Sequence, residues 1–250
     1  MLIGVDGCKA GWVAVGGAEA EAIELRVFSS FAEILAWAPP DAIIAVDMPI
    51  GLPDRIEGGG RAPEKHVRPM LGERQSSVFA IPARAVVEMG ARIAGRTAHD
   101  HPLHQQASAL AKTLSEPPKG VSIQAFYLFP KILEIDGLLR TDLRLCERVK
   151  ECHPEVAFTV LNEGDAMRLP KKIKGKVNLD GMDERRALLA SYGLRAPFLH
   201  DAPPSGVGSD DVLDAAVCWL VARRLKRGEA RPFPDPPGRD MHGVEIAIWA

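Results

Sequence analysis

The sequence predicts an α/β fold, a mixed five-stranded sheet flanked by helices, with a mainly helical insertion. Short strand-like segments at 2–5, 12–15 and 23–27 are followed by a helical segment and then by an apolar run at 42–46. A fifth strand is expected at 148–152, after a long stretch of helical pattern. The 250 residues suit one large domain with a substantial insertion.

The first three strands are expected to form an antiparallel meander. Residues 2–5 and 12–15 are apolar runs on either side of a turn that contains Gly7 and Gly11, which is typical of a β-hairpin. In the segment 23–27, apolar residues alternate with charged ones. That alternation indicates a strand with one buried face.

A helix and a buried strand follow the meander. Ser29 or Ser30 is placed to cap a short helix that the proline pair after Ala38 ends. Residues 42–46 are continuously apolar, as in a parallel strand buried on both faces. A three-stranded meander and a helical crossover to a parallel strand form the opening of the ribonuclease H-like fold. We therefore expect strands 2–5 and 42–46 to be neighbours.

The middle of the chain, about residues 52–145, has a different pattern. Helical spacing of apolar residues is found at 83–93, 103–114 and 123–139. We interpret this region as a largely helical insertion within a single ribonuclease H-like domain that spans residues 1–250.

Strands and helices are expected again after the insertion. The expected elements, in order, are a strand at 148–152, a basic loop at 162–178, a helix at 183–192, a long helix at 210–227 and a last strand at 244–248.

Composition narrows the class of partner and the compartment. The formal charge of −2 gives no global basic field, so a nucleic acid would have to meet a local patch. No apolar run is long enough to span a bilayer, and no signal peptide is visible at the N-terminus. The four cysteines form no C-x-x-C pair. We expect a cytoplasmic protein with reduced thiols.

Four aspartates lie where the expected fold brings chain segments together. Asp6 ends the first strand and Asp47 ends the fourth, while Asp211 and Asp214 lie one turn apart near the start of the last long helix. Each has a simpler interpretation taken alone. Aspartate is common in turns, and acidic residues in a first helical turn interact favourably with the helix dipole.

Their combination favours a metal site. In the ribonuclease H-like topology the ends of the first and fourth strands are adjacent, and the final helix packs across them. Carboxylates crowded together repel and cannot all stay ionised without a cation. Oxygen ligands of this kind favour Mg²⁺ or Mn²⁺, and such ions can activate water and stabilise the leaving oxygen of a phosphodiester. We therefore predict that Asp6, Asp47, Asp211 and Asp214 are metal ligands and catalytic residues.

Glu151 and His153 end the candidate fifth strand and are expected to flank the same site. Glu151 is a candidate ligand or general base, and His153 is a candidate substrate contact. The simpler interpretation is a turn at the strand end that Pro154 locks.

Two basic segments are candidates for contact with phosphate. Arginine forks and hydroxyl groups suit phosphate oxygens, and the insertion supplies Arg61, Arg68, Arg74, Ser76 and Ser77. The alternative is a solvated segment held by its own salt bridges.

The second basic segment is a lysine run. It contains Lys171, Lys172, Lys174 and Lys176, and it is either a solvated loop or a contact to a nucleic-acid backbone. Together the two segments predict weak, local binding of nucleic acid.

Five segments carry a resemblance to a known family. They are VDGCKAGW at 5–12, DMPIGLP at 47–53, LGERQSSVF at 71–79, ECHPE at 151–155 and DDVLDA at 210–215. In this order they resemble the motif set of the family called domain of unknown function 429, which is usually described as predicted ribonuclease H-like nucleases. The resemblance covers nearly the whole chain. It implies that fold, and the acidic positions of ribonuclease H-like nucleases match the four aspartates.

The expected function is a nuclease that hydrolyses a phosphodiester with Mg²⁺ or Mn²⁺. The sequence has no phosphate loop, dinucleotide fingerprint or nucleophile elbow to indicate a rival chemistry. Two alternatives stay open. One is a nucleotide-binding phosphotransferase of the actin and sugar-kinase type, and the other is a non-catalytic binding protein that keeps the fold.

Overall fold

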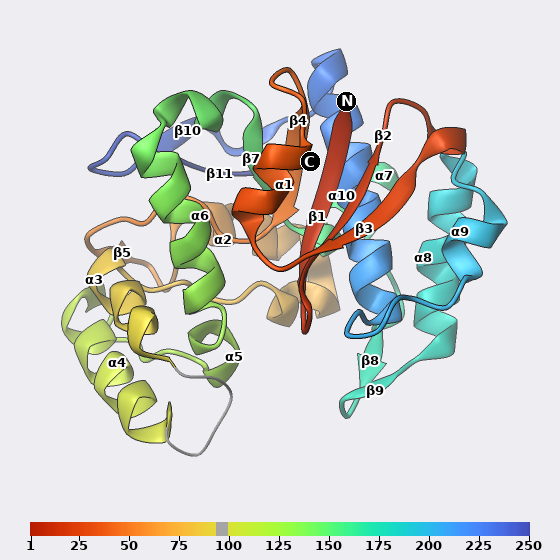
Figure 1. The fold of residues 1–250 in the computed structure, drawn as a ribbon. Helices are drawn as coiled ribbons and strands as arrows, with labels where there is room; N and C mark the ends of the chain where they lie inside the picture. The colour runs from red at the N-terminus through yellow and green to blue at the C-terminus, as the bar shows by residue number, and fades with distance from the viewer. Residues whose placement is uncertain (94–99) are drawn as a thin grey trace.

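A mixed five-stranded sheet forms the centre of the computed structural model, which describes residues 1–93 and 100–250 (Figure 1). The strand order is β3-β2-β1-β4-β7. The strands are β1 (Leu2–Cys8), β2 (Gly11–Gly17), β3 (Glu24–Phe28), β4 (Ile43–Asp47) and β7 (Val149–Cys152). Strand β2 is antiparallel to β1 and β3, and β4 is parallel to β1 and β7. The predicted α/β sheet, with its first and fourth strands adjacent, is confirmed.

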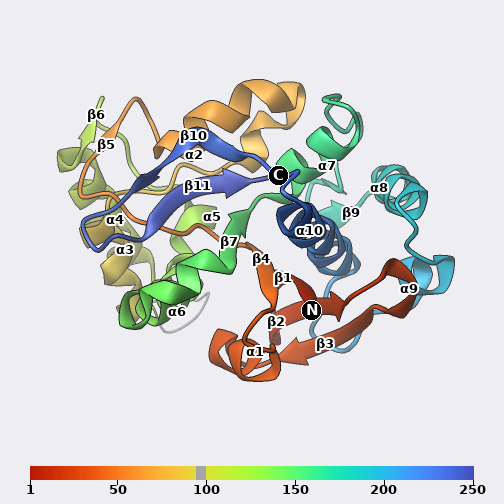
Figure 2. The same cartoon turned by 90° about the horizontal axis from the view of Figure 1, so that it is seen from above.

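Helices cover both faces of this sheet (Figure 2). On one face, α1 (Phe31–Trp37) and α6 (Phe129–Thr141) pack against side chains such as Ile3 and Val46. On the other face lie α7 (Pro154–Leu161), α8 (Leu179–Ser191) and α10 (Ser209–Arg227). The inner strands β1, β2 and β4 are therefore buried on both sides, as the continuous apolar run in β4 predicted, whereas the edge strand β3 is partly exposed.

Strand β1 and helix α10 are in direct backbone contact at Gly4. A Cβ atom at this position would lie 2.0 Å from the backbone nitrogen of Trp219 and 2.1 Å from the carbonyl oxygen of Ala215. Only glycine leaves room for the helix at this distance. The contact holds the N-terminal half of α10 close to β1. One of the contacting residues, Ala215, directly follows Asp214 in the chain.

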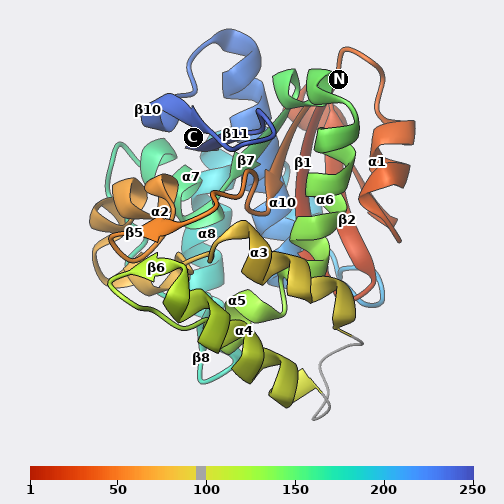
Figure 3. The same cartoon turned by 90° about the vertical axis from the view of Figure 1, so that its left-hand side faces the viewer.

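The region between β4 and β7 is mainly helical, as expected (Figure 3). It contains the following elements: β5 (Ile56–Glu57), α2 (Ala62–Val67), η2 (Arg68–Ser77), α3 (Arg84–Val87), η3 (Glu88–Arg92), α4 (His101–Thr113), β6 (Ser115–Glu116), α5 (Ile123–Phe126), α6 and η5 (Leu143–Glu147). The expected helix at 123–139 is two helices, because Pro130 lies in the first turn of α6 and favours a new helix start there.

Helix α7 was not predicted from the sequence, although local signals for it exist. Pro154 occupies its first turn, and Glu155 is favourably placed for the helix dipole. Val156 and Phe158 are fully buried in neighbouring parts of the core. The helix is apolar almost all round, so its sequence lacks the amphipathic period that marks a surface helix.

The C-terminal part also departs from expectation. The proline-rich segment forms β10 (Pro232–Arg239), which pairs antiparallel with β11 (Glu245–Trp249) in a separate ribbon. The predicted last strand is thus present but lies outside the main sheet. Within the expected basic loop, β8 (Lys172–Ile173) and β9 (Lys176–Val177) form a short hairpin.

The remaining short elements are η1 (Ala20–Ala22) and α9 (Ala196–His200). Across residues 1–93 and 100–250, every helix is too short or too polar to cross a bilayer.

Candidate metal centre

Asp6 and Asp47 occupy matching positions on neighbouring parallel strands. The register of β1 and β4 pairs Asp6 with Asp47, each near the carboxyl end of its strand. The apolar residues before them, such as Val5 and Val46, are fully buried and fix that register. The two carboxylates are therefore held side by side at one edge of the sheet.

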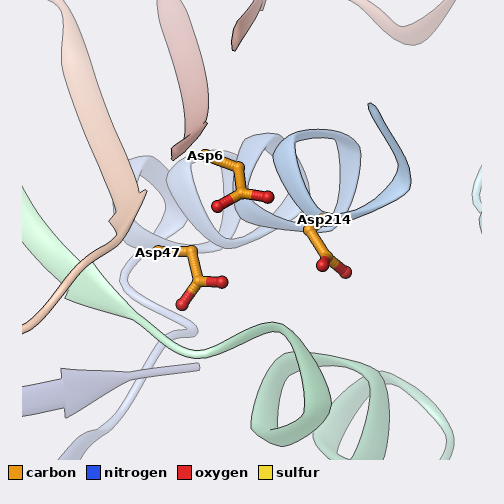
Figure 4. Close-up of side chains that lie close together, drawn as sticks. All are labelled: Asp6, Asp47 and Asp214. Carbon is orange, nitrogen blue, oxygen red and sulfur yellow. The ribbon is translucent and has the colours of Figure 1, made fainter. Parts of the chain in front are cut away.

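Asp214 completes the group from α10. One carboxylate oxygen from each of Asp6, Asp47 and Asp214 lies within 4.8 Å of the others. Figure 4 shows the three side chains directed into a shared space between the strand ends and the helix. The sequence-based prediction that these three positions converge is confirmed geometrically.

The carboxylates are crowded in a way that disfavours their charged forms. Burial, and then the charge of Asp47, raise the pKa of Asp6 well above its ordinary value. Burial and the charge of Asp214 do the same to the pKa of Asp47. Burial raises the pKa of Asp214 to about 6. Within residues 1–93 and 100–250, the buried Oδ1 of Asp214 has no hydrogen-bond partner. Three crowded carboxylates, one of them with an oxygen that lacks a hydrogen-bond partner, are suited to bind a hard divalent cation.

Lys171 also belongs to this cluster, which the sequence did not reveal. Its Nζ forms an ion pair with Oδ2 of Asp214, and its side chain is only 19% exposed. The sequence predicts a solvated loop or a nucleic-acid contact for the lysine run at 171–176, whereas Lys171 is largely buried and pairs with Asp214. Because 43 residues separate Lys171 from Asp214, no local pattern could have signalled the contact.

Asp211 does not join the three-carboxylate group. Its Oδ2 accepts a hydrogen bond from the Gly208 backbone nitrogen at 2.8 Å, at the start of α10. The shared helix face expected for Asp211 and Asp214 does not bring their carboxylates together, because unpaired amides at a helix N-terminus attract the first-turn carboxylate. Asp211 does line the adjoining cavity, and burial raises its pKa.

Glu151 and Arg61 form a buried ion pair beside the cluster. Arg61 Nη2 lies 2.7 Å from Glu151 Oε1, and Glu151 Oε2 accepts a hydrogen bond from the Ile50 backbone nitrogen at 2.7 Å. Arg61 is 2% exposed and also pairs with Glu64 at 2.6 Å. Burial raises the pKa of Glu151 to about 7, although Arg61 opposes the shift. These contacts brace the loop after β4, and they occupy the guanidinium group expected to hold phosphate.

His153 lies at the wall of the same cavity. Its Nε2 is 3.4 Å from the carbonyl oxygen of Ser77, and its buried Nδ1 has no partner among the described residues. Burial lowers the pKa of His153 to about 4, so the ring is neutral near pH 7. A neutral histidine with a free nitrogen can accept or donate one hydrogen bond to a ligand.

The other predicted phosphate contacts lie further from the aspartates. Arg68 donates to the carbonyl oxygen of Val78 at 3.1 Å, and Arg74 lies 3.7 Å from Glu73. Arg68 and Ser76 line a separate hollow of about 380 Å³. The structure therefore brings Ser77 and His153 to the acidic site but places Arg68, Arg74 and Ser76 outside it.

A cavity of about 820 Å³ opens at the carboxylate cluster. Its lining includes Asp6, Asp47, Lys9, Lys131 and Lys172. The volume is in the range of sites that hold small molecules. A lining with both carboxylates and lysines suits a ligand that carries both a metal ion and phosphate charge.

The family profile described as protein of unknown function (DUF429) matches residues 4–239. This chain belongs to the DUF429 family. The DUF429 match spans all three clustered aspartates and Lys171. Searches of the curated proteins and of the solved structures found no match for this DUF429 chain.

Proposed function

We propose that this protein is a metal-dependent nuclease that hydrolyses a phosphodiester with Mg²⁺ or Mn²⁺. The observation that carries the proposal is the buried group of Asp6, Asp47 and Asp214, whose carboxylate oxygens lie within 4.8 Å of one another. Divalent ions bound by such a group would activate water for attack and stabilise charge on the leaving oxygen. The protein's own part is to hold three oxygen ligands in a fixed arrangement, of which Asp6 and Asp47 line the cavity.

The fold supports the same proposal by analogy. Ribonuclease H-like nucleases place acidic residues on the first strand, near the fourth strand and on the last helix. In this protein Asp6, Asp47 and Asp214 come from β1, β4 and α10. Because one fold can carry many functions, the analogy supports the site and leaves the reaction to experiment.

Residues around the cluster have distinct roles in this proposal. The ion pair of Arg61 with Glu151 fixes the loop that follows Asp47. Lys9 is exposed at the cavity and is placed to contact a phosphate oxygen. His153, neutral near pH 7, offers a hydrogen bond to the ligand. The near-neutral net charge of −2 predicts modest affinity with a shallow salt dependence.

The decisive experiment is a cleavage assay on single-stranded, duplex, hybrid and branched substrates, with Mn²⁺ and with chelator. We expect cleavage with Mn²⁺ only. Asp6→Asn should lower the rate by at least about 10²-fold, because a lost ligand weakens stabilisation of charge in the transition state. The matched control is Asp142→Asn, whose carboxylate pairs with Arg144 outside the cluster, and it should keep the wild-type rate.

Three results would contradict the proposal. Cleavage that persists in chelator would exclude the metal, and cleavage retained by Asp6→Asn would exclude the site. Metal binding without cleavage of any substrate would favour a binding protein. In that case a thermal shift with a nucleoside triphosphate would separate the phosphotransferase alternative from a purely structural role.

A further inference from the structure

Lys171 is built into the acidic cluster. The segment that carries it is fixed to α8 by several hydrogen bonds. Glu184 accepts from the Leu169 backbone nitrogen at 3.0 Å, and Arg185 Nη1 donates to the Leu169 carbonyl oxygen at 2.9 Å. The backbone nitrogen of Asn178 donates to the Lys171 carbonyl oxygen at 2.8 Å. These hydrogen bonds fix the backbone on both sides of Lys171, and its ammonium group is therefore held next to Asp214.

The two oxygens of Asp214 have different surroundings. Oδ2 forms the ion pair with Lys171, whereas the buried Oδ1 has no hydrogen-bond partner among the described residues. A carboxylate that bridges two divalent ions uses both oxygens. With Oδ2 held by Lys171, Asp214 has one oxygen left for an ion.

The charges of the cluster also indicate a single divalent ion. Ionised Asp6, Asp47 and Asp214 carry three negative charges, and Lys171 returns one positive charge. One divalent ion balances the remaining two charges, and a second would leave a buried net charge that is costly.

Two neighbouring carboxylates have cationic partners of their own. Glu155 is bonded through both oxygens to Arg185, at 2.7 and 2.8 Å, and Lys172 lies 2.6 Å from Asp210. Lys171 is therefore the cation paired directly with the three-carboxylate group among the described residues.

We infer that the Lys171 ammonium takes the place of a second divalent cation, so that the centre binds one ion together with Lys171. The inference rests on the metal site of the proposed function and specifies its composition. Asp6, Asp47 and Oδ1 of Asp214 would hold the ion, while Lys171 neutralises Oδ2 and supplies positive charge that a second metal would otherwise provide.

The test is isothermal titration calorimetry of the full chain with MnCl₂ alone, with no nucleic acid present. The wild-type protein should bind one Mn²⁺ per chain, and its bound Mn²⁺ should give the electron paramagnetic resonance spectrum of an isolated ion. Lys171→Met removes the charge and keeps the length of the side chain. This variant should bind the first ion at least about tenfold more tightly, because a nearby positive charge is gone, or bind two spin-coupled ions.

Two further variants serve as controls. Lys171→Arg keeps the positive charge and should keep the stoichiometry of one. Lys176→Met changes an exposed lysine of the same hairpin that is not part of the carboxylate group or of the cavity lining, and should bind Mn²⁺ as the wild type does. The wild-type stoichiometry tests the inference even if Lys171→Met fails to fold.

Two Mn²⁺ ions on the wild-type chain would overturn the inference, as would a folded Lys171→Met variant with the affinity and stoichiometry of Lys176→Met. These outcomes are separable from the proposed function. One bound ion without cleavage of any substrate would reject the nuclease and keep the one-ion centre. Cleavage with two bound ions would keep the nuclease and reject the one-ion centre.

Discussion

Asp6 lies in an environment that opposes its own ionisation. It is 7% exposed and faces two other carboxylates, so its charged form is destabilised in the metal-free protein. Functional sites commonly hold such unfavourable arrangements, which the bound ligand relieves. The cost should therefore be visible in stability measurements made in chelator.

We predict a specific pH dependence for that cost. The pKa of Asp6 is raised in the folded state, so between the unfolded and folded pKa values the folded state binds more protons. The free energy of unfolding contributed by this group is therefore greatest at low pH and falls as pH rises through the raised pKa. In chelator, Asp6→Asn should melt at a higher temperature than the wild type at pH 8, and the two curves should approach each other towards pH 4.

Scanning calorimetry at several pH values measures this difference. Groups such as His153, whose pKa is lowered to about 4, contribute to both proteins and cancel in the comparison. With Mn²⁺ the order should reverse at pH 8, because only the wild type gains from the bound ion. Melting curves that stay parallel across the pH range would show that Asp6 is not strained.

The sequence could predict some site residues and not others, for a physical reason. Asp6 and Asp47 lie near the carboxyl ends of β1 and β4, two strands that the expected fold makes neighbours. The position of Asp214 could also be predicted, because the last long helix is expected to pack across the sheet near these strand ends. Lys171 belongs to a hairpin segment with no strong pattern, and its contact depends on how α8 anchors that segment. A contact of this kind joins residues far apart in the chain, and it produces no periodic pattern in the sequence around either residue.

At the scale of elements, the contact between β1 and α10 determines the position of Asp214. We predict that Gly4→Ala lowers the free energy of unfolding by about 3 kcal/mol or more, because the added Cβ would lie 2.0 Å from a backbone atom of α10. The helix would have to move away from the strand. The affinity for Mn²⁺ should also fall, because Asp214 moves away from Asp6 and Asp47 together with the helix.

Gly137→Ala is the matched control for this substitution. Gly137 lies within α6, and a Cβ there meets no described atom within 4 Å. Alanine should raise the free energy of unfolding by about 0.5–1 kcal/mol through helix propensity. Urea denaturation of both variants gives the comparison, and equal effects of the two substitutions would contradict the close-packing argument.

Element boundaries show where sequence patterns were informative. The main strands and α10 were predicted closely, because long apolar runs and caps mark them. The proline-rich strand β10 was missed, since proline argues against a strand unless the strand lies at an edge. Among the described residues β10 pairs only with β11, so its free edge does not need the amide donors that proline lacks. Tertiary context outweighed local propensity there.

For the whole molecule, Arg84 links three regions that are distant in sequence. Its guanidinium lies 2.8 Å from Asp136 on α6 and 2.7 Å from Asp240, which follows β10. Asp240 also accepts a hydrogen bond from the Leu52 backbone nitrogen at 3.1 Å. The insertion, the C-terminal ribbon and the loop after β4 are therefore joined through one buried arginine.

We predict that Arg84→Met lowers the free energy of unfolding by about 3–5 kcal/mol, because it removes the closest ion pair of two buried carboxylates and leaves Asp136 only the more distant Arg140. Arg144→Met is the matched control, since Arg144 pairs with Asp142 at an exposed position and its loss should change stability very little. Chemical denaturation followed by circular dichroism measures both. Similar stability losses in the two variants would mean that the buried network contributes nothing beyond an exposed pair.

The backbone contact at Gly4 has a consequence for how the protein is made. Strand β1 is translated well before α10, the helix that packs on it. Until α10 has emerged, the apolar face formed by Leu2, Val13 and Val15 lacks that helix as a cover. The nascent chain therefore passes through an interval in which exposed apolar surface favours aggregation. During that interval Asp6 and Asp47 can lie side by side, but Asp214 cannot yet join them.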